Sequence, residues 1–161
     1  MTGMTYLNEC LLYGTSQVIT LNSVRGFHSS IMLNDSMLWI MGGKLYYNGY
    51  HVLDSTEFVT TEMAVNGPTL PEPSAWHCSV LFPGNGNVYL IGVGSNGGNK
   101  VWVVNPSNGF TFTQGPSLMT SRRIFACGTM SIGTKSIIVV AGPDASVEIL
   151  DPLSNQWVAG K

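Results

Sequence analysis

The sequence repeats itself at an interval of about 50 residues, and this period limits the possible folds more than any other feature of the chain. Three segments align, each with an apolar run, a short polar turn and a second apolar run: residues 25–43, 74–93 and 122–142. His77 follows His28 by 49 residues, and Phe125 follows His77 by 48. A unit of this length that recurs three times predicts a stack of similar supersecondary units.

Each unit is predicted to form four short antiparallel β-strands. The second apolar runs are apolar at successive positions, which is typical of a strand buried on both faces; they are residues 38–41, 88–91 and 137–140. The 19 glycines and 8 prolines are scattered along the chain and disfavour long helices. Residues 50–66 form the longest stretch without Gly or Pro, and their Val and Thr content favours two strands. We therefore predict an all-β fold.

The later part of each unit also repeats. An apolar strand is followed by an Asp or Asn, a turn and an aromatic residue, with Asp54, Asn105 and Asp151 at the turn position. Pro follows Asn105 and Asp151. A side-chain acceptor ahead of a proline favours a tight turn, because the acceptor can bind the turn's own backbone N–H.

Taken in order, the Arg-x-x-His, Gly-Gly, Asp-Pro and Trp-or-Phe landmarks resemble Kelch repeats over about residues 25–161. The resemblance implies a Kelch-type β-propeller whose blades are four-stranded antiparallel sheets. The sequence departs from the family pattern at several positions. The glycine doublet is complete only in the first unit, and Phe125 stands where the other units have His. The family's Tyr before the turn residue is replaced in all three units, by Leu53, Val104 and Leu150.

This alignment divides the chain into a candidate outer hairpin of a preceding blade and three Kelch-like blades; their bounds are residues 1–24, 25–71, 72–118 and 119–161, the last ending at a blade boundary. Propellers close with about four to eight blades. We therefore expect either a fragment of a longer propeller or self-association through uncovered blade faces.

Composition excludes some functions. Charged residues make up 10% of the chain and the net charge is −2, so no basic field favours a nucleic-acid partner. The densest apolar run, residues 137–141, is far shorter than the ~20 residues that span a bilayer, so no membrane partner is expected.

We expect no enzyme activity, and the resemblance implies a protein–protein interaction module. Two alternatives remain open. One is a fragment of a secreted or carbohydrate-related Kelch propeller, such as a galactose-oxidase-like copper enzyme; the other is a truncated product without independent function. A cytoplasmic location is favoured over a secreted parent.

No catalytic, cofactor-binding or metal-binding residue is predicted. Residues 92–97 match the GxGxxG pattern of dinucleotide sites, but a strand follows where such a site needs a helix. His77 and Cys78 are adjacent in a predicted strand, so their side chains point to opposite faces. The three cysteines, Cys10, Cys78 and Cys127, are odd in number and far apart. We interpret them as small buried thiols, while a secreted parent would leave the pairing of two of them open.

Antiparallel strand order predicts that the loop between the second and third strands and the connection between units emerge at the same end. Long loops on a rigid scaffold are where binding usually occurs. This end forms a candidate partner-binding face with residue types favoured at interfaces: Tyr46, Tyr47, Trp76, Arg122 and Arg123. For Arg25 and Arg122, a structural role beside aromatic rings or carbonyl groups is the favoured interpretation, and ligand contact is the alternative.

One modification signal is present. Asn34-Asp35-Ser36 is a formal N-glycosylation acceptor, which would have meaning only in a secreted parent.

Overall fold

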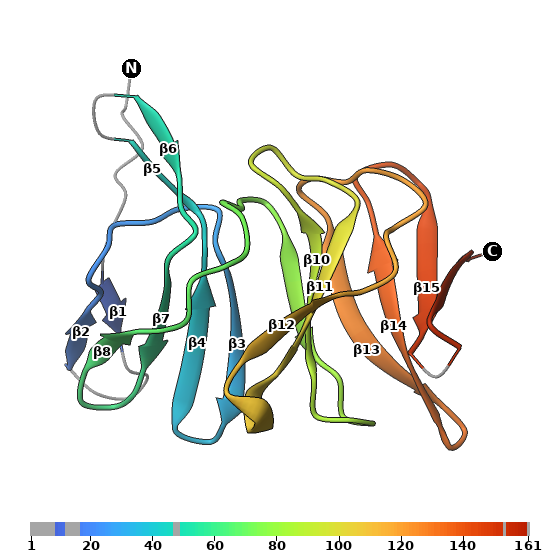
Figure 1. Ribbon diagram of the computed structural model, residues 1–161, viewed down its shortest axis with the longest axis horizontal. Coiled ribbons are helices and arrows are strands. Elements are labelled where there is room, and N and C mark those ends of the chain that lie inside the picture. Colours follow the sequence, from blue (N-terminus) through green and yellow to red (C-terminus); the bar gives the residue numbers. More distant parts are fainter. Residues whose placement is uncertain (1–8, 12–16, 47–48, 153, 161) are drawn as a thin grey trace. The chain divides into compact units, whose positions relative to one another are not determined.

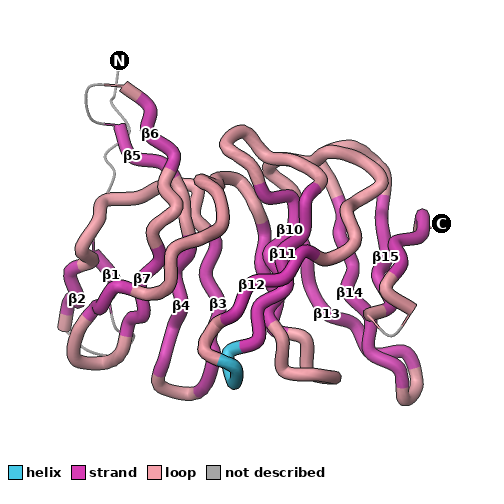
Figure 2. Tube along the Cα trace, in the orientation of Figure 1, coloured by secondary structure: helices cyan, strands magenta, loops and turns pink. Residues whose placement is uncertain are grey.

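The computed structural model describes residues 9–11, 17–46, 49–152 and 154–160. The chain divides into two compact units, Met1–Ala75 and Trp76–Lys161. Strands and short loops make up both units, and the single helical segment among the described residues is the 3-10 helix Pro106–Asn108 (Figure 2). The prediction of an all-β chain with four-stranded antiparallel sheets is confirmed.

No helix in the described part of the chain has the length and apolarity that crossing a lipid bilayer requires.

Unit 1 contains one four-stranded antiparallel sheet and two small hairpins (Figure 1). The strands of the sheet, in spatial order, are β3 (Ser29–Asn34), β4 (Met37–Met41), β7 (Thr56–Val59) and β8 (Ala64–Asn66). The hairpins pair β1 (Glu9–Leu11) with β2 (Val18–Thr20), and β5 (Lys44–Tyr46) with β6 (Tyr50–Val52). Residues Ile19, Leu21, Ile40 and Val59 form a buried hydrophobic cluster in this unit.

Unit 2 contains two four-stranded antiparallel sheets (Figure 1). The first consists of β9 (Cys78–Leu81), β10 (Val88–Val93), β11 (Lys100–Asn105) and β12 (Thr111–Gln114). The second consists of β13 (Ala126–Ile132), β14 (Lys135–Ala141), β15 (Val147–Asp151) and β16 (Gln156–Ala159). All six residues of β10 are buried, as its continuous apolar sequence predicts.

The two sheets of unit 2 share one hydrophobic core. The first sheet contributes Val80, Tyr89, Ile91 and Val101, and the second contributes Ile138, Val140, Leu150 and Trp157. The indole N–H of Trp157 donates to the carbonyl of Pro116 at 2.8 Å. The connection between the sheets is therefore fixed to the outermost strand of the second sheet.

A backbone feature recurs with the sequence period. Phe27, Trp76 and Ile124 have φ values of 56°, 57° and 54°, although none is a glycine. Each lies one residue before the aligned His28, His77 or Phe125. A left-handed conformation is costly for such side chains. Its recurrence at one position of each unit therefore indicates a common chain path into the first strand.

The strand register changes the alignment of the glycine doublet. Glu148 pairs with Val140 as Glu57 pairs with Ile40, so Gly142 corresponds to Gly42. Gly42, Gly92 and Gly142 all have positive φ, at 60°, 73° and 91°. The first glycine of the doublet is therefore present in all three units, and the sequence alignment of the third unit was shifted by one residue.

The turn residue of the first unit is Thr60, and the prediction of Asp54 was wrong. Thr60 follows β7, and its Oγ1 accepts backbone N–H groups of Glu62 and Met63 at 3.2 and 3.3 Å. Asn105 acts in the same way, accepting the N–H of Ser107 at 2.9 Å. The error arose because the predicted loop between the second and third strands was assigned to residues 44–49 in this unit. Part of this segment pairs as the hairpin β5–β6 instead, which places the third strand of the sheet later in the sequence.

Two of the cysteines are joined in a disulfide, so their interpretation as buried thiols was wrong. Cys78 in β9 and Cys127 in β13 are bonded, with 6.0 Å between their Cα atoms and 49 residues between them in sequence. Packed sheets lie about 10 Å apart on average, but the first strands of these two sheets approach more closely at this point. The Cys10 side chain lies outside the described residues.

Replacing Gly92 by Ala tests the close approach at this recurring glycine. A Cβ at Gly92 would lie 2.7 Å from ring atoms of Phe125, whereas a Cβ at Gly86 would meet nothing within 4 Å. The two glycines have similar φ values, 73° and 69°, so both variants share a backbone cost of about 1–2 kcal/mol. We expect Gly92→Ala to lose about 1–3 kcal/mol more, because it overpacks the core. Urea unfolding of both variants measures this difference, and equal losses would contradict the expectation.

Candidate functional site

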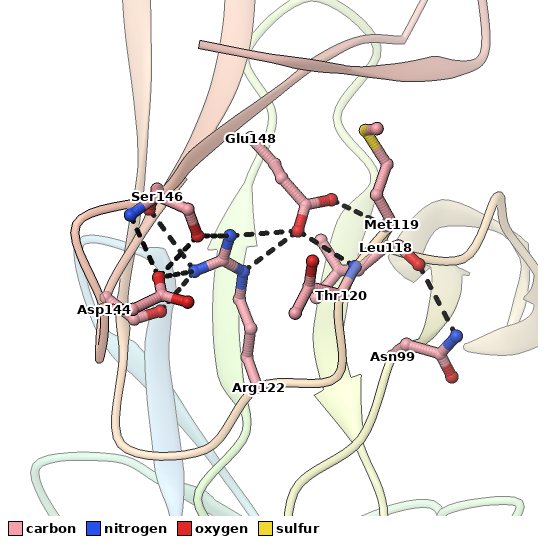
Figure 3. A network of polar contacts seen from close by, with 9 residues as sticks. Asn99, Leu118, Met119, Thr120, Arg122, Asp144, Ser146 and Glu148 are labelled. Carbon is pink, nitrogen blue, oxygen red and sulfur yellow. Dashed lines mark hydrogen bonds and ion pairs between the residues drawn. The ribbon is translucent and has the colours of Figure 1, made fainter. Parts of the chain in front are cut away.

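The densest polar network of unit 2 is centred on Arg122, which is 2% exposed (Figure 3). Its Nε and Nη2 donate to Oε1 of Glu148 at 3.1 and 3.0 Å. Nη1 donates to the carbonyl of Gly142, and Nη2 donates to Oγ of Ser146 at 2.7 Å. The guanidinium thus connects β15 to the loop between β14 and β15.

The carboxylate of Glu148 extends this network to the connection between the two sheets. It is 3% exposed, and it accepts the backbone N–H groups of Met119 and Thr120 at 2.7 and 3.2 Å (Figure 3). Charge-assisted hydrogen bonds of this kind satisfy a buried carboxylate that would otherwise be costly to desolvate. The segment that ends at Arg122 is therefore held in two ways. Glu148 binds its backbone at Met119 and Thr120, and the Arg122 side chain binds the same carboxylate.

Asp144 lies at the exposed side of the same network. Hydrogen bonds from the hydroxyl and backbone N–H of Ser146, with a smaller contribution from the positive charge of Arg122, lower the pKa of this carboxyl. Its Oδ1 lies 3.5 Å from Nη1 of Arg122, and its side chain is 60% exposed. Solvent screening makes this contact weaker than the buried pair.

Unit 1 contains a similar arrangement around Arg25, which differs in that Arg25 Nε has no hydrogen-bond partner where Arg122 Nε donates to Glu148. Its Nη2 lies 2.6 Å from Oε1 of Glu57, and both side chains are buried. Nη1 donates to the carbonyl groups of Gly42 and Ser55 at 2.7 and 3.0 Å. Each partner occupies the same place in its unit as its counterpart in unit 2, so the network is built twice from equivalent positions.

Glu57 also anchors the segment that precedes its arginine, as Glu148 does. It accepts the N–H groups of Asn22 and Ser23 at 2.6 and 3.1 Å. His28 follows shortly after Arg25. Partial removal of water from the imidazole, together with the positive charge of Arg25, lowers the pKa of His28, although the residue is exposed.

The sheet β9–β12 has no such ion pair, because the two positions hold other residues. Trp102 pairs with Leu90 as Glu57 pairs with Ile40, and it therefore stands in the carboxylate position. The arginine position holds Ser74. The network is therefore a feature of two of the three four-stranded sheets.

These contacts support the structural interpretation of the two arginines. Arg122 is buried, so it does not belong to an accessible partner-binding face, and this part of the sequence prediction is corrected. The sequence prediction did not include Glu57 or Glu148. The sequence contains a signal that could have identified Glu148 as a site residue, because Glu148 is the single charged residue within the apolar stretch Val147–Leu150.

Unit 2 also carries an exposed surface beside this network, which we call the loop face; it consists of Asn96, Met119, Arg123 and Ile124. Met119 and Ile124 are 63% and 67% exposed. Arg123 Nη1 donates to Asn96 Oδ1 at 3.5 Å. Gly98 and Arg122 exchange two backbone hydrogen bonds of 2.9 Å, which places the loop after β10 beside the connection before β13, as the strand order predicted.

The remaining predicted face residues are placed as follows. Trp76 is half-buried and lies at the start of unit 2, two residues before Cys78. Tyr46 ends β5 and pairs with Tyr50. The side chain of Tyr46 and all of Tyr47 lie outside the described residues.

Among residues whose placement the structure describes, no group of three or more His, Cys, Asp or Glu side chains is arranged to hold a metal ion.

Compared with models of known protein families and with curated protein sequences, the chain matches neither a family nor a curated protein.

Substituting Glu148 by Gln tests the role of the network. The change keeps the shape of the side chain but removes the buried counter-ion of Arg122 and leaves only the exposed Asp144 carboxylate, so we expect a loss of about 3–5 kcal/mol in the free energy of unfolding. Asp144→Asn is the matched control, because it removes an exposed carboxylate from the same guanidinium and should leave stability nearly unchanged. Denaturant unfolding measures both variants. Equal stabilities would show that the buried pair does not hold the connection in place.

Proposed function

We propose that this chain is a protein-interaction module built from Kelch-type propeller blades, without catalysis of its own. The observation that carries the proposal is the loop face of unit 2, where exposed side chains stand on a backbone fixed by a buried ion pair. Arg123 and Ile124 directly follow the buried Arg122, and the N–H of Met119 is bound by Glu148. A surface fixed in this way loses little conformational entropy when it binds.

The chemistry of the loop face supports a protein partner. Arg and Met are enriched at protein–protein interfaces, and Arg is frequent among the residues that contribute most to binding. Two large apolar side chains of the loop face, Met119 and Ile124, are more than half exposed, and Ile124 directly follows the Arg123 cation in the chain. An apolar surface with one cation suits a partner that offers an apolar side chain beside a carboxylate.

The disulfide favours the alternative of a secreted Kelch-type parent over a cytoplasmic one. Disulfides form and persist in oxidising compartments and are rare in the cytosol. The bond between Cys78 and Cys127 lies in the same unit as the loop face. We therefore propose that the module acts outside the cytosol.

We also propose self-association through the outer face of the sheet β13–β16. Met130, Ile132 and Val158 on this face are 52%, 62% and 54% exposed. Ile132 and Val158 line an apolar groove together with Ile137 and Ile149, and the charged Lys135 and Asp151 also line it.

The neighbouring sheet of unit 2 supports this proposal. By strand register, Met130 and Val139 correspond to Phe82 and Tyr89 of the sheet β9–β12. Both counterparts are 4% exposed and lie in the core that the second sheet covers. The outer face of β13–β16 thus has the pattern of a face that packs against another sheet.

Photo-crosslinking from the loop face tests the interaction proposal. A photoreactive phenylalanine analogue is placed at Arg123 or, as the control, at Asn108 in the turn at the opposite end of β11. We expect covalent adducts with another polypeptide from position 123 and not from position 108 when the chain is irradiated in extracellular fluid or cell extract. Equal labelling from both positions would contradict a partner site on the loop face.

Sedimentation velocity of the purified chain tests self-association. We expect oligomers at micromolar concentration, because burying apolar area contributes about 25 cal/mol per Å². The double variant Met130→Lys and Val158→Lys should sediment as a monomer, since each lysine would be desolvated in the interface. Met119→Lys on the loop face is the control and should leave the oligomers intact. A wild-type monomer with a sharp unfolding transition would contradict the proposal.

A further inference from the structure

We propose that Asn34 is the acceptor of an N-linked glycan. Asn34-Asp35-Ser36 is an Asn-x-Ser triplet in which x is not proline, the sequence that this modification requires. The triplet alone is a weak signal, because a pattern of only three residues occurs by chance in many sequences. Its place in the fold and the disulfide of the other unit are two further observations, and they are independent of the triplet and of each other.

The structure presents the triplet at the tip of a hairpin. β3 ends at Asn34, β4 begins at Met37, and Asp35 with Ser36 forms the turn between them. Asn34, Asp35 and Ser36 are all exposed. A bulky, hydrated glycan needs a surface position of this kind, because it cannot enter a packed core.

Within the turn, the acceptor side chain is oriented by the residue that completes the triplet. The Oδ1 atom of Asn34 accepts both the backbone N–H and the hydroxyl of Ser36, each at 3.0 Å. The Oδ1 atom is therefore turned toward the hairpin. The Nδ2 atom, which would carry the sugar, is attached to the same carboxamide carbon on the other side.

The disulfide shows which compartment suits this chemistry. A disulfide such as that between Cys78 and Cys127 is typical of chains that mature in an oxidising environment, for example the lumen of the endoplasmic reticulum. N-linked glycans belong to secreted chains. The disulfide lies in unit 2 and the triplet in unit 1, so two different chemistries in two separate units point to the same compartment.

The modification is a glycosyl transfer from a lipid-linked oligosaccharyl diphosphate. The Nδ2 atom of Asn34 forms a bond to C1 of the first sugar, and the bond between C1 and the phosphate oxygen breaks. The lipid diphosphate leaves with the bonding electron pair, and the Nδ2–H proton passes to the transferase or to solvent. Nothing is oxidised or reduced in this step.

The chain contains its own negative control. Asn105-Pro106-Ser107 is also exposed at Asn105, and Asn105 Oδ1 accepts the N–H of Ser107 at 2.9 Å, much as in the first triplet. Proline at the middle position excludes it as an acceptor. The two triplets therefore share an asparagine side chain that closes a turn and differ at the residue that decides glycosylation.

The test is expression of the full chain behind a cleavable signal sequence in eukaryotic cells. Total chain from cells and medium is then treated with a peptide-N-glycosidase in heavy-oxygen water, which converts a glycosylated Asn to a labelled Asp. We expect one glycan on the wild type, with the label at position 34 and none at position 105. Asn34→Gln and Ser36→Ala should abolish the glycan, whereas Ser36→Thr should retain it. Pro106→Ala should add a second glycan at Asn105.

The outcomes decide the proposal in either direction. A wild-type chain that reaches the endoplasmic reticulum, shown by removal of its signal sequence, and yet has the unmodified mass would overturn it. A glycan that persists in Asn34→Gln would overturn it as well. Peptide mapping without reduction gives a second readout, because it detects the Cys78–Cys127 disulfide and the glycan in the same chain. A chain with this disulfide and no glycan at position 34 would show that the disulfide does not indicate glycosylation.

Discussion

A guanidinium buried against a carboxylate fixes the ends of the strands in both units. Removing two charges from water is costly, and the cost is offset only when every donor and acceptor finds a partner in good geometry. Arg122 and Glu148 meet this condition by also binding the backbone of Gly142 and Met119, whereas Arg25 leaves its Nε without a hydrogen-bond partner. The ion pair therefore positions the loops as well as bridging two side chains. The exposed residues of the loop face depend on this positioning.

The same architecture also forms without the ion pair. In the sheet β9–β12, Trp102 occupies the carboxylate position, yet Gly92 keeps the positive φ of its counterparts. Trp76 likewise has the left-handed conformation of Phe27 and Ile124. The chain path is thus common to the three sheets, while the charge network is present in two. This distinction indicates that backbone geometry, and not the ion pair, defines the repeat.

Much of the fold could be predicted from the sequence, because continuous apolar runs specify strands buried on both faces. The strands β4, β10 and β14 lie where such runs predicted them. Other features depend on contacts distant in sequence. Glu148 could not be paired with Arg122 without knowing the register of β14 and β15, and Cys78 could not be paired with Cys127 without knowing which strands are neighbours. The turn at Thr60 was missed because the hairpin β5–β6 forms where a loop was predicted and places the third strand of the sheet later in the sequence.

The disulfide has a consequence for how unit 2 gains and loses structure. Repeated units contact mainly their neighbours, so terminal units can unravel while the others stay folded. The bond closes a loop of 49 residues, one period of the sequence, and joins the first strands of both sheets. By chain entropy, such a closure disfavours the denatured ensemble by about 4 kcal/mol. Even when the packing between the sheets is lost, the disulfide keeps β9 and β13 close together, so the contact between these strands can form again. Unit 2 should therefore unfold and refold as one cooperative body.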